Sequence, residues 1–201
     1  MKREEEIREL LIGNAIHLIG TGGFEKATTK EMTHCRGDLP DFKMNEIYIY
    51  RLFGNKEGLY EAAFACLDKE LFYAFYEAAR EVGGFGNGDE KRITAFLETS
   101  WKFILQNEER CRSYVRYYYS AYFKGSSAEG HRTRFASIVE AATPAFIEKA
   151  DVSAILHSAF TTLLDFGIRV YNGDLEDSEI NRPHIFKVVY NIMAPYFKEE
   201  A

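Results

Sequence analysis

Side chains capable of covalent chemistry are scattered along this sequence and form no recognised catalytic arrangement. Adjacent carboxylates occur at 108–109 and 199–200, but these positions fall at the end of an expected helix and at the tail, where solvation is the default. Segment 54–58 lacks the spacing of a phosphate-binding loop, and no Gly-x-Ser-x-Gly turn for a serine nucleophile is present. We therefore predict no enzyme, no catalytic residue and no cofactor.

Metal ligands are equally sparse in the sequence. Cys35, Cys66 and Cys111 are odd in number and widely spaced, which argues against a disulfide framework and fits a reducing compartment. His34 adjoins Cys35, but neighbouring side chains diverge on a helix, so no shared metal is expected. No apolar run approaches the roughly 20 residues that span a bilayer, and the charged start lacks the apolar stretch of a signal peptide. A cytoplasmic protein is predicted.

Apolar residues recur at helical spacing almost throughout, so the fold class is predicted to be all-α. An apolar stripe that includes Ile7, Leu11 and Ile19 indicates a first helix. The glycines of segment 20–23 are expected to stop it, because glycine readily takes the left-handed conformation found at helix ends. Thr28 and Glu31 have the spacing of a capping box that opens a second helix, expected to end near Gly37.

The remaining helices follow from caps and breakers. Asn45 is expected to cap a third helix that ends near Phe53, and Asn55 a fourth that runs to the glycine-rich segment 83–88. Pro144 is expected to kink a later helix. Five further helices are expected over about 89–107, 109–124, 128–149, 151–172 and 182–198.

The most specific pattern is segment 47–60, which reads IYIYRLFGNKEGLY. This segment resembles the signature that ends the recognition helix of TetR-family regulators. The shared pattern is an aromatic residue three places before a phenylalanine, followed by a small residue, a cap, Lys-Glu and Leu. The resemblance extends over residues 7–64 and implies a three-helix, helix-turn-helix DNA-binding domain over 1–58. It further implies a larger helical domain over 59–201 for ligand binding and dimerisation.

The resemblance also assigns roles to individual positions. Tyr50 and Lys56 match residues that touch phosphates, and Lys56 begins a helix, where backbone N–H groups attract phosphate. In the early turns of a recognition helix, Asn45 can pair with adenine and Glu46 can accept from a cytosine amino group, although Glu46 is as readily a surface charge. The residues predicted to contact DNA are Thr28, Thr29, Asn45, Glu46, Tyr48, Tyr50 and Lys56.

Two departures from the family pattern leave an alternative open. The segment between Gly37 and Asn45 is several residues longer than usual, so it either repositions the third helix or props it with Leu39 and Phe42. Residues 1–60 contain nine Lys/Arg and ten Asp/Glu, a net charge of −1, so a DNA-binding face requires the basic residues to gather on one side. The alternative is a related ligand-binding or interaction protein that has lost sequence-specific DNA binding.

Aromatic side chains in the C-terminal part suggest a pocket for a small-molecule effector. Tyr114, Tyr118 and Tyr122 share one helix face, which is typical either of core packing or of a pocket lining. His157 is likewise either a core histidine or a ligand contact. The predicted lining comprises Trp101, Phe103, Tyr114, Tyr118, Tyr122, His157 and Phe160.

The last two long helices are expected to pair with those of a second copy. The resemblance implies a homodimer, and the apolar side chains of these helices favour a partner that covers them. A twofold dimer implies a palindromic double-stranded operator with half-sites about one helical turn apart. We therefore predict a repressor that a small molecule releases from its operator. The side chains concerned are Ile155, Phe160, Leu163, Leu164, Phe166, Ile168, Val170, Phe186, Val189, Tyr190, Ile192 and Met193.

Overall fold

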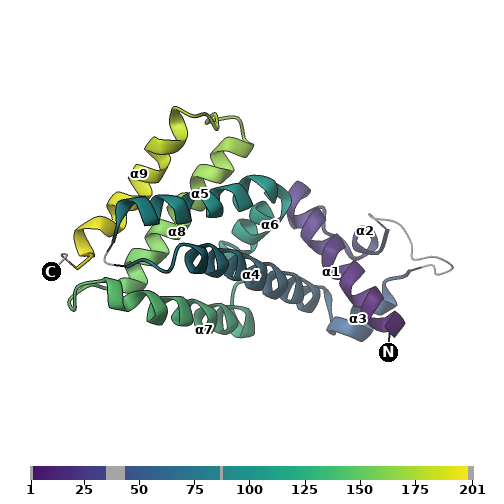
Figure 1. Cartoon of the computed structure of the whole chain (residues 1–201). Coiled ribbons are helices and arrows are strands. Elements are labelled where there is room, and N and C mark those ends of the chain that lie inside the picture. Colours follow the sequence, from purple (N-terminus) through teal and green to yellow (C-terminus); the bar gives the residue numbers. More distant parts are fainter. Residues whose placement is uncertain (1, 35–43, 87, 199–201) are drawn as a thin grey trace. The chain divides into compact units, whose positions relative to one another are not determined.

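The computed structural model describes residues 2–34, 44–86 and 88–198. Over these residues it contains nine α-helices, two 3-10 helices and one isolated bridge between Phe146 and Phe197, so the predicted all-α class is confirmed (Figure 1). The expected end of the second helix near Gly37 and the packing of Leu39 and Phe42 lie outside the described residues. No helix within the described ranges is long and apolar enough to cross a membrane.

The chain packs into two compact units. The first comprises the residues up to 70 together with 109–131, and the second comprises 71–108 and the residues from 132 onward. Helices α4 (Lys56–Glu81) and α7 (Gly125–Ala142) contribute several residues to both units, and the helix that begins at Glu108 contributes its first residue to the second unit. The functional boundary predicted after residue 58 falls inside the first unit and remains a prediction.

The first unit begins with three helices that pack around one core. Helix α1 (Lys2–Gly22) contacts both α2 (Thr29–His34) and α3 (Ile47–Phe53) (Figure 1). Phe24 and Phe53 are half-buried at the edge of this core. Its fully buried side chains from these helices and from the start of α4 include Leu11, Ile16, Met32, Ile49 and Leu59.

Helix α1 ends within the glycine segment 20–23, as expected, although not at its first glycine, Gly20. It continues to Gly22, and Gly23, with a φ of 78°, ends it. Gly20 serves a different purpose, because a Cβ there would lie 2.3 Å from the carbonyl oxygen of Glu109 in α6 (Glu108–Tyr118). Arg116 of α6 also donates to the Gly20 carbonyl at 2.8 Å, so α6 closes on the C-terminal end of α1.

The second unit is built around α5 (Glu90–Gln106), α8 (Val152–Tyr171) and α9 (Asn181–Met193), each of which packs against the other two. Pro144 does not kink a helix; α7 ends at Ala142, and the proline lies in the 3-10 turn Thr143–Ala145. A second 3-10 turn, Ala194–Tyr196, follows α9, which is therefore shorter than expected. In both places the missing proline N–H ends the α-helical ladder.

Several apolar side chains on α8 and α9 were expected to be covered by a second copy of the chain. The single chain already buries them. The mutual packing of α5, α8 and α9 accounts for their burial. Phe166, Ile168 and Val170 remain half-buried. The side chains buried in the single chain are Ile155, Leu163, Leu164, Phe186, Val189 and Met193.

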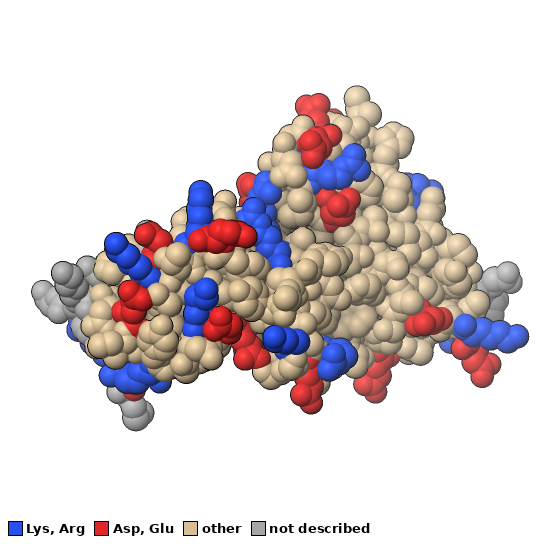
Figure 2. Space-filling model, turned by 180° about the vertical axis from the view of Figure 1, so that it is seen from behind, with Lys and Arg blue, Asp and Glu red and all other residues tan. Residues whose placement is uncertain are grey.

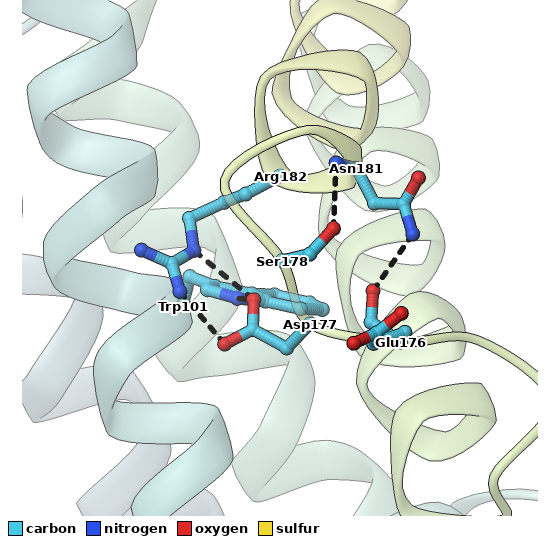
Figure 3. Close-up of polar contacts among 6 residues, drawn as sticks. All are labelled: Trp101, Glu176, Asp177, Ser178, Asn181 and Arg182. Atoms are coloured by element: carbon cyan, nitrogen blue, oxygen red, sulfur yellow. Dashed lines mark hydrogen bonds and ion pairs between the residues drawn. The ribbon is translucent and has the colours of Figure 1, made fainter.

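The connection between α8 and α9 is tied to α5 through the only tryptophan (Figure 3). Trp101 is buried, and its indole Nε1 donates to Asp177 Oδ1 at 3.0 Å. Arg182 donates to both oxygens of the same carboxylate, from Nε to Oδ1 at 3.0 Å and from Nη2 to Oδ2 at 2.8 Å. These hydrogen bonds, above all those from Arg182, lower the pKa of Asp177. A buried indole N–H requires an acceptor, and Asp177 provides it.

We expect Asp177→Asn to lower the free energy of unfolding by about 1–3 kcal/mol at pH 7, because it weakens charge-assisted hydrogen bonds. Since the folded state lowers the pKa of Asp177, the stabilisation is present above the ordinary carboxyl pKa of about 4 and is lost as the pH falls through the folded value. Urea unfolding followed by tryptophan fluorescence from pH 7 to pH 3 should therefore show the difference between the two proteins shrinking. Glu176→Gln is the control, because that side chain is exposed. Equal losses in both variants would contradict this role of Asp177.

Candidate nucleic-acid interface and ligand cavity

Helix α3 is held with one face inward by the packing of the first unit. Ile49 is fully buried. The hydroxyl of Tyr60, in α4, donates to the carbonyl of Ala27 at 2.6 Å, and Asn14 Nδ2 donates to the Met32 carbonyl at 2.8 Å. Burial raises the pKa of Tyr60, so its phenol stays a neutral donor. These contacts tie α4 to the segment before α2 and tie α1 to α2 itself.

The turn between α3 and α4 is closed by two glycines. Gly54 takes a φ of 79°, and its N–H donates to the Tyr50 carbonyl at 3.0 Å, which ends α3. Asn55 Oδ1 accepts from the N–H of Gly58 at 2.7 Å and so caps α4, as its position predicted. A Cβ at Gly58 would lie 2.1 Å from the carbonyl oxygen of Phe53. The sequence reasoning missed this requirement, because it depends on how closely the two helices approach.

The outer face of α3 presents an exposed stripe formed by Ile47, Tyr50 and Arg51. Ile47 is 69% exposed and Tyr50 is 55% exposed, and the 3.6-residue period places all three on the side away from the buried Ile49. The Arg51 guanidinium lies 4.5 Å from the Tyr48 ring centroid, and its Nη2 is 3.3 Å from Glu4 Oε1. Ile47 and Arg51 were not among the predicted contacts, although the helical period already put them beside Tyr50.

Several predicted DNA-contacting side chains bond within the protein. Asn45 Oδ1 accepts from the N–H of Ile47 at 3.0 Å, which engages one of the two atoms needed for a bidentate contact with adenine. The Thr29 hydroxyl donates to Glu46 Oε2, which brings two of the predicted residues together. Thr28, just before α2, accepts from the N–H of Glu31 at 3.2 Å, the first half of the expected capping box.

Lys56 is the first residue of α4, and its position fits a phosphate contact. Its side chain is half-buried, with Nζ 5.6 Å from the centroid of the Tyr60 ring. Among the described side chains on the face shown in Figure 2, Lys and Arg alternate with Asp and Glu around the N-terminal end of the chain and form no uninterrupted basic area. Positive charge on this face is therefore local to individual side chains.

The tyrosine stripe of α6 belongs to the core of the first unit. Tyr114 stacks on Phe64 with 5.3 Å between ring centroids, and Tyr118 stacks on Tyr114 at 6.0 Å. Tyr122 follows the end of α6 and lies 4.8 Å from Phe24. Aromatic rings that stack on one another bury their apolar faces within the fold. Of the two alternatives left open for this stripe, the geometry favours core packing.

Helix α6 ends at Tyr118, short of the expected residue 124. The Ser120 hydroxyl donates to the Tyr117 carbonyl at 2.7 Å and accepts from the N–H of Tyr122 at 3.1 Å. A serine that bonds the local backbone in this way competes with the helical ladder. The turn it forms ends the helix.

A cavity of about 230 Å³ lies in the second unit, lined from α4, α5, α7, α8 and α9. Phe160 is the member of the predicted pocket set that lines it. Small side chains, Ala79 and Ala159 among them, alternate with large rings and leave the space open. The principal rings on its wall are Phe72, Phe75, Phe85, Phe96, Phe135 and Phe160.

The other predicted pocket residues lie away from this lining. Trp101 is engaged with Asp177, and the carbonyl of the half-buried Phe103 accepts from Asn107 Nδ2 at 2.8 Å. His157 is half-buried, with its ring 6.0 Å from the centroid of Phe135, which does line the cavity. The missed signal was the helical spacing of phenylalanine and alanine along α4 and α8.

The sequence matches no protein-family model and no curated protein. Its structure, however, is similar to solved structures over nearly the whole chain. A TetR family transcription regulator from Marinobacter aquaeolei VT8 superimposes with a TM-score of 0.75 at 14% identity, covering 95% of this chain and 97% of the other. A TetR-like transcriptional regulator from Rhodococcus sp. RHA1 gives 0.57 at 17% identity, with 92% of each chain covered.

A third similar structure is that of AibR in complex with isovaleryl coenzyme A and operator DNA. It gives a TM-score of 0.58 at 17% identity and covers 94% of this chain and 99% of AibR. The likeness to these proteins extends through both the helix-turn-helix segment and the larger helical part. This chain therefore has the fold of TetR-family transcription regulators.

Proposed function

We propose that this protein is a DNA-binding transcriptional repressor that a small molecule releases from its operator. The observation that carries the proposal is the outer face of α3, where Ile47, Tyr50 and Arg51 are exposed while Ile49 is buried. An α-helix that presents such a face can enter the major groove while its neighbours brace it. The TetR-type fold supports this assignment.

Contacts with the phosphate backbone would flank this helix. Lys56 and the N-terminus of α4 offer one charged and several backbone donors to a phosphate. The Tyr50 hydroxyl supplies another donor from the exposed stripe. Thr28 lies just before α2 and Thr29 is its first residue. The phosphate backbone of the second DNA strand would pass there. These contacts position the protein, whereas Ile47 and Arg51 can reach base edges.

Two copies of the chain would pair through α8 and α9, and the dimer would bind a palindromic site. Exposed apolar residues remain on this side of the second unit, with Val188 of α9 46% exposed and Ile180 just before it 76% exposed. A twofold axis there would create one isologous interface and two α3 helices for successive major grooves.

Ligand binding would act on DNA affinity through a shift between two conformations. Helix α4 carries Lys56 at its first position and Phe72 and Phe75 on the cavity wall. A ligand that prefers one position of this helix changes the spacing of two DNA-binding regions in the dimer. AibR, which has a similar structure, is known in complex with both an acyl coenzyme A and operator DNA.

A ligand-binding protein of the same fold without DNA binding is the second candidate. The contacts of Glu46 with Thr29, of Asn45 with Ile47 and of Arg51 with Glu4 favour it, because DNA would have to compete with each. Electrophoretic mobility shifts on duplexes from a random pool and from the gene's upstream region separate the two candidates. Binding to no duplex, even at low salt, would support the second.

Replacing Lys56 tests the phosphate contact. We expect Lys56→Gln to weaken binding to all duplexes alike and to reduce the slope of log K against log salt by about 1, because one fewer counterion is released. Fluorescence anisotropy on a duplex selected by the wild type, at several salt concentrations, measures this slope. Lys69→Gln is the matched control, an exposed lysine later on the same helix. Identical slopes for the two variants would refute the contact.

A charge placed on α9 tests the dimer. Val188→Glu should weaken self-association by about a hundredfold or more, because an unpaired carboxylate would be buried in the interface. Size-exclusion chromatography with light scattering should find the wild type dimeric and this variant monomeric at micromolar concentration. Ile147→Glu, which changes another exposed apolar residue outside α8 and α9, should remain dimeric. A monomeric wild type, or a dimeric Val188→Glu, would exclude the proposed interface.

A further inference from the structure

The wall of the cavity in the second unit is apolar along almost its whole extent. Among the described residues that line it, Arg80 alone carries a formal charge and Tyr76 alone has a hydroxyl. The remaining lining residues are phenylalanine, other apolar residues and glycine. An isolated polar or charged group placed in such a wall loses its hydration without gaining a hydrogen bond. The part of a ligand that occupies the body of the cavity must therefore be apolar.

Both polar residues are exposed, so they mark the end at which the cavity meets solvent. Tyr76 is 54% exposed, and the Arg80 side chain is 69% exposed. Both lie on α4, four residues apart, and so on one helix face. An apolar cavity of about 150 Å³ is large enough for benzene. The 230 Å³ found here accommodates a substituted ring or a carbon chain, with its last atoms beside these two residues.

The guanidinium of Arg80 retains donors for a ligand. Glu77, one turn earlier on α4, accepts from Nη2 and orients the side chain. A guanidinium has five N–H donors in a planar fork, which suits a carboxylate or phosphate oxygen pair. Glu77 is an anion in its own right, so a ligand anion must be placed on the other nitrogens of the fork.

A second arginine lies near the same end. Arg92 Nη1 donates to the carbonyl of Gly83 at 3.5 Å, and a Cβ at Gly86 would lie 2.9 Å from the same nitrogen. Gly84 and Phe85, which lie between these two contacts in the sequence, both line the cavity. Arg80, which pairs with Glu77, and Arg92 thus place two guanidinium groups near this end of the cavity, and their field favours an anion there.

From these observations we infer that the effector is an anionic amphiphile. Its apolar body, a medium-length carbon chain or a substituted ring, fills the cavity, and its single anionic group binds Arg80 at the solvent-facing end. The inference rests on the proposed function in that it takes this cavity to be the effector site. It adds the chemical class of the ligand and the residue that selects it.

Matched ligands of equal chain length test the inference on the full-length protein without DNA. Isothermal titration calorimetry with octanoate and 1-octanol should give octanoate a dissociation constant about tenfold lower, because a charge-assisted hydrogen bond is added to the same apolar contacts. In Arg80→Gln most of this preference should be lost, because only Arg92 then remains near that end of the cavity. Arg132→Gln removes an exposed arginine of α7 that does not line the cavity, and it should keep the preference for octanoate.

A substitution that fills the cavity tests whether the ligands bind inside it. Ala159 is buried in the lining, so Ala159→Leu should abolish binding of both compounds, while circular dichroism verifies that the variant is folded. The inference is overturned if neither compound binds the wild type, if 1-octanol binds as well as octanoate, if Arg80→Gln keeps the preference, or if folded Ala159→Leu still binds.

A separate DNA-binding measurement keeps the two proposals apart. If octanoate binds in the expected way but the protein binds no duplex, or holds a duplex equally well with and without octanoate, the proposed repressor function fails and the ligand class stands. If the protein binds DNA but shows no preference for octanoate, the ligand class fails and DNA binding stands.

Discussion

The packing beneath α3 determines which of its side chains reach solvent, and the proposed activity depends on it. Burying a side chain such as Ile49 contributes roughly 1.5–3 kcal/mol, whereas a single buried hydrogen bond contributes about 1 kcal/mol. The apolar core therefore supplies most of the stability, and the bond from Tyr60 to the Ala27 carbonyl fixes the register of α4 against the segment before α2. With Ile49 inward, the period of the helix leaves Ile47, Tyr50 and Arg51 outward.

Backbone geometry is the second constraint, and it explains three glycines in two different ways. Gly54 supplies a left-handed conformation, whereas Gly20 and Gly58 lie within helices where a Cβ would overlap a carbonyl oxygen. The first closes the turn from α3 to α4. The other two let α6 reach the end of α1 and let α4 start directly beside the end of α3.

Features that depend on neighbouring residues could be predicted from the sequence, whereas contacts between segments far apart in the chain could not. The fold class, the capping by Thr28 and Asn55 and the order of the helices follow from neighbouring residues and helical periodicity. The close approach at Gly20 depends on Glu109, and the partner of Trp101 lies on the connection between α8 and α9, so neither has a local signal.

The candidate sites show the same division. Tyr50 is exposed on α3, and its contact with a phosphate stays a prediction. The pocket prediction selected the densest aromatic stripe, but stacked rings such as Tyr114 on Phe64 fill space. The cavity instead lies where alanines interrupt the phenylalanines of α4, α7 and α8. A cavity requires missing volume, which a search for large side chains overlooks.

The central claim is that the outer face of α3 meets a DNA duplex. Its most direct test places a photoreactive side chain there, as Tyr50→p-benzoylphenylalanine, with Tyr73→p-benzoylphenylalanine as a control on α4 that is at least as exposed. After irradiation with a labelled duplex selected by the wild-type protein, we predict a covalent protein–DNA product for position 50 and none for position 73. Absence of a product at position 50, or equal products at both positions, would contradict the account.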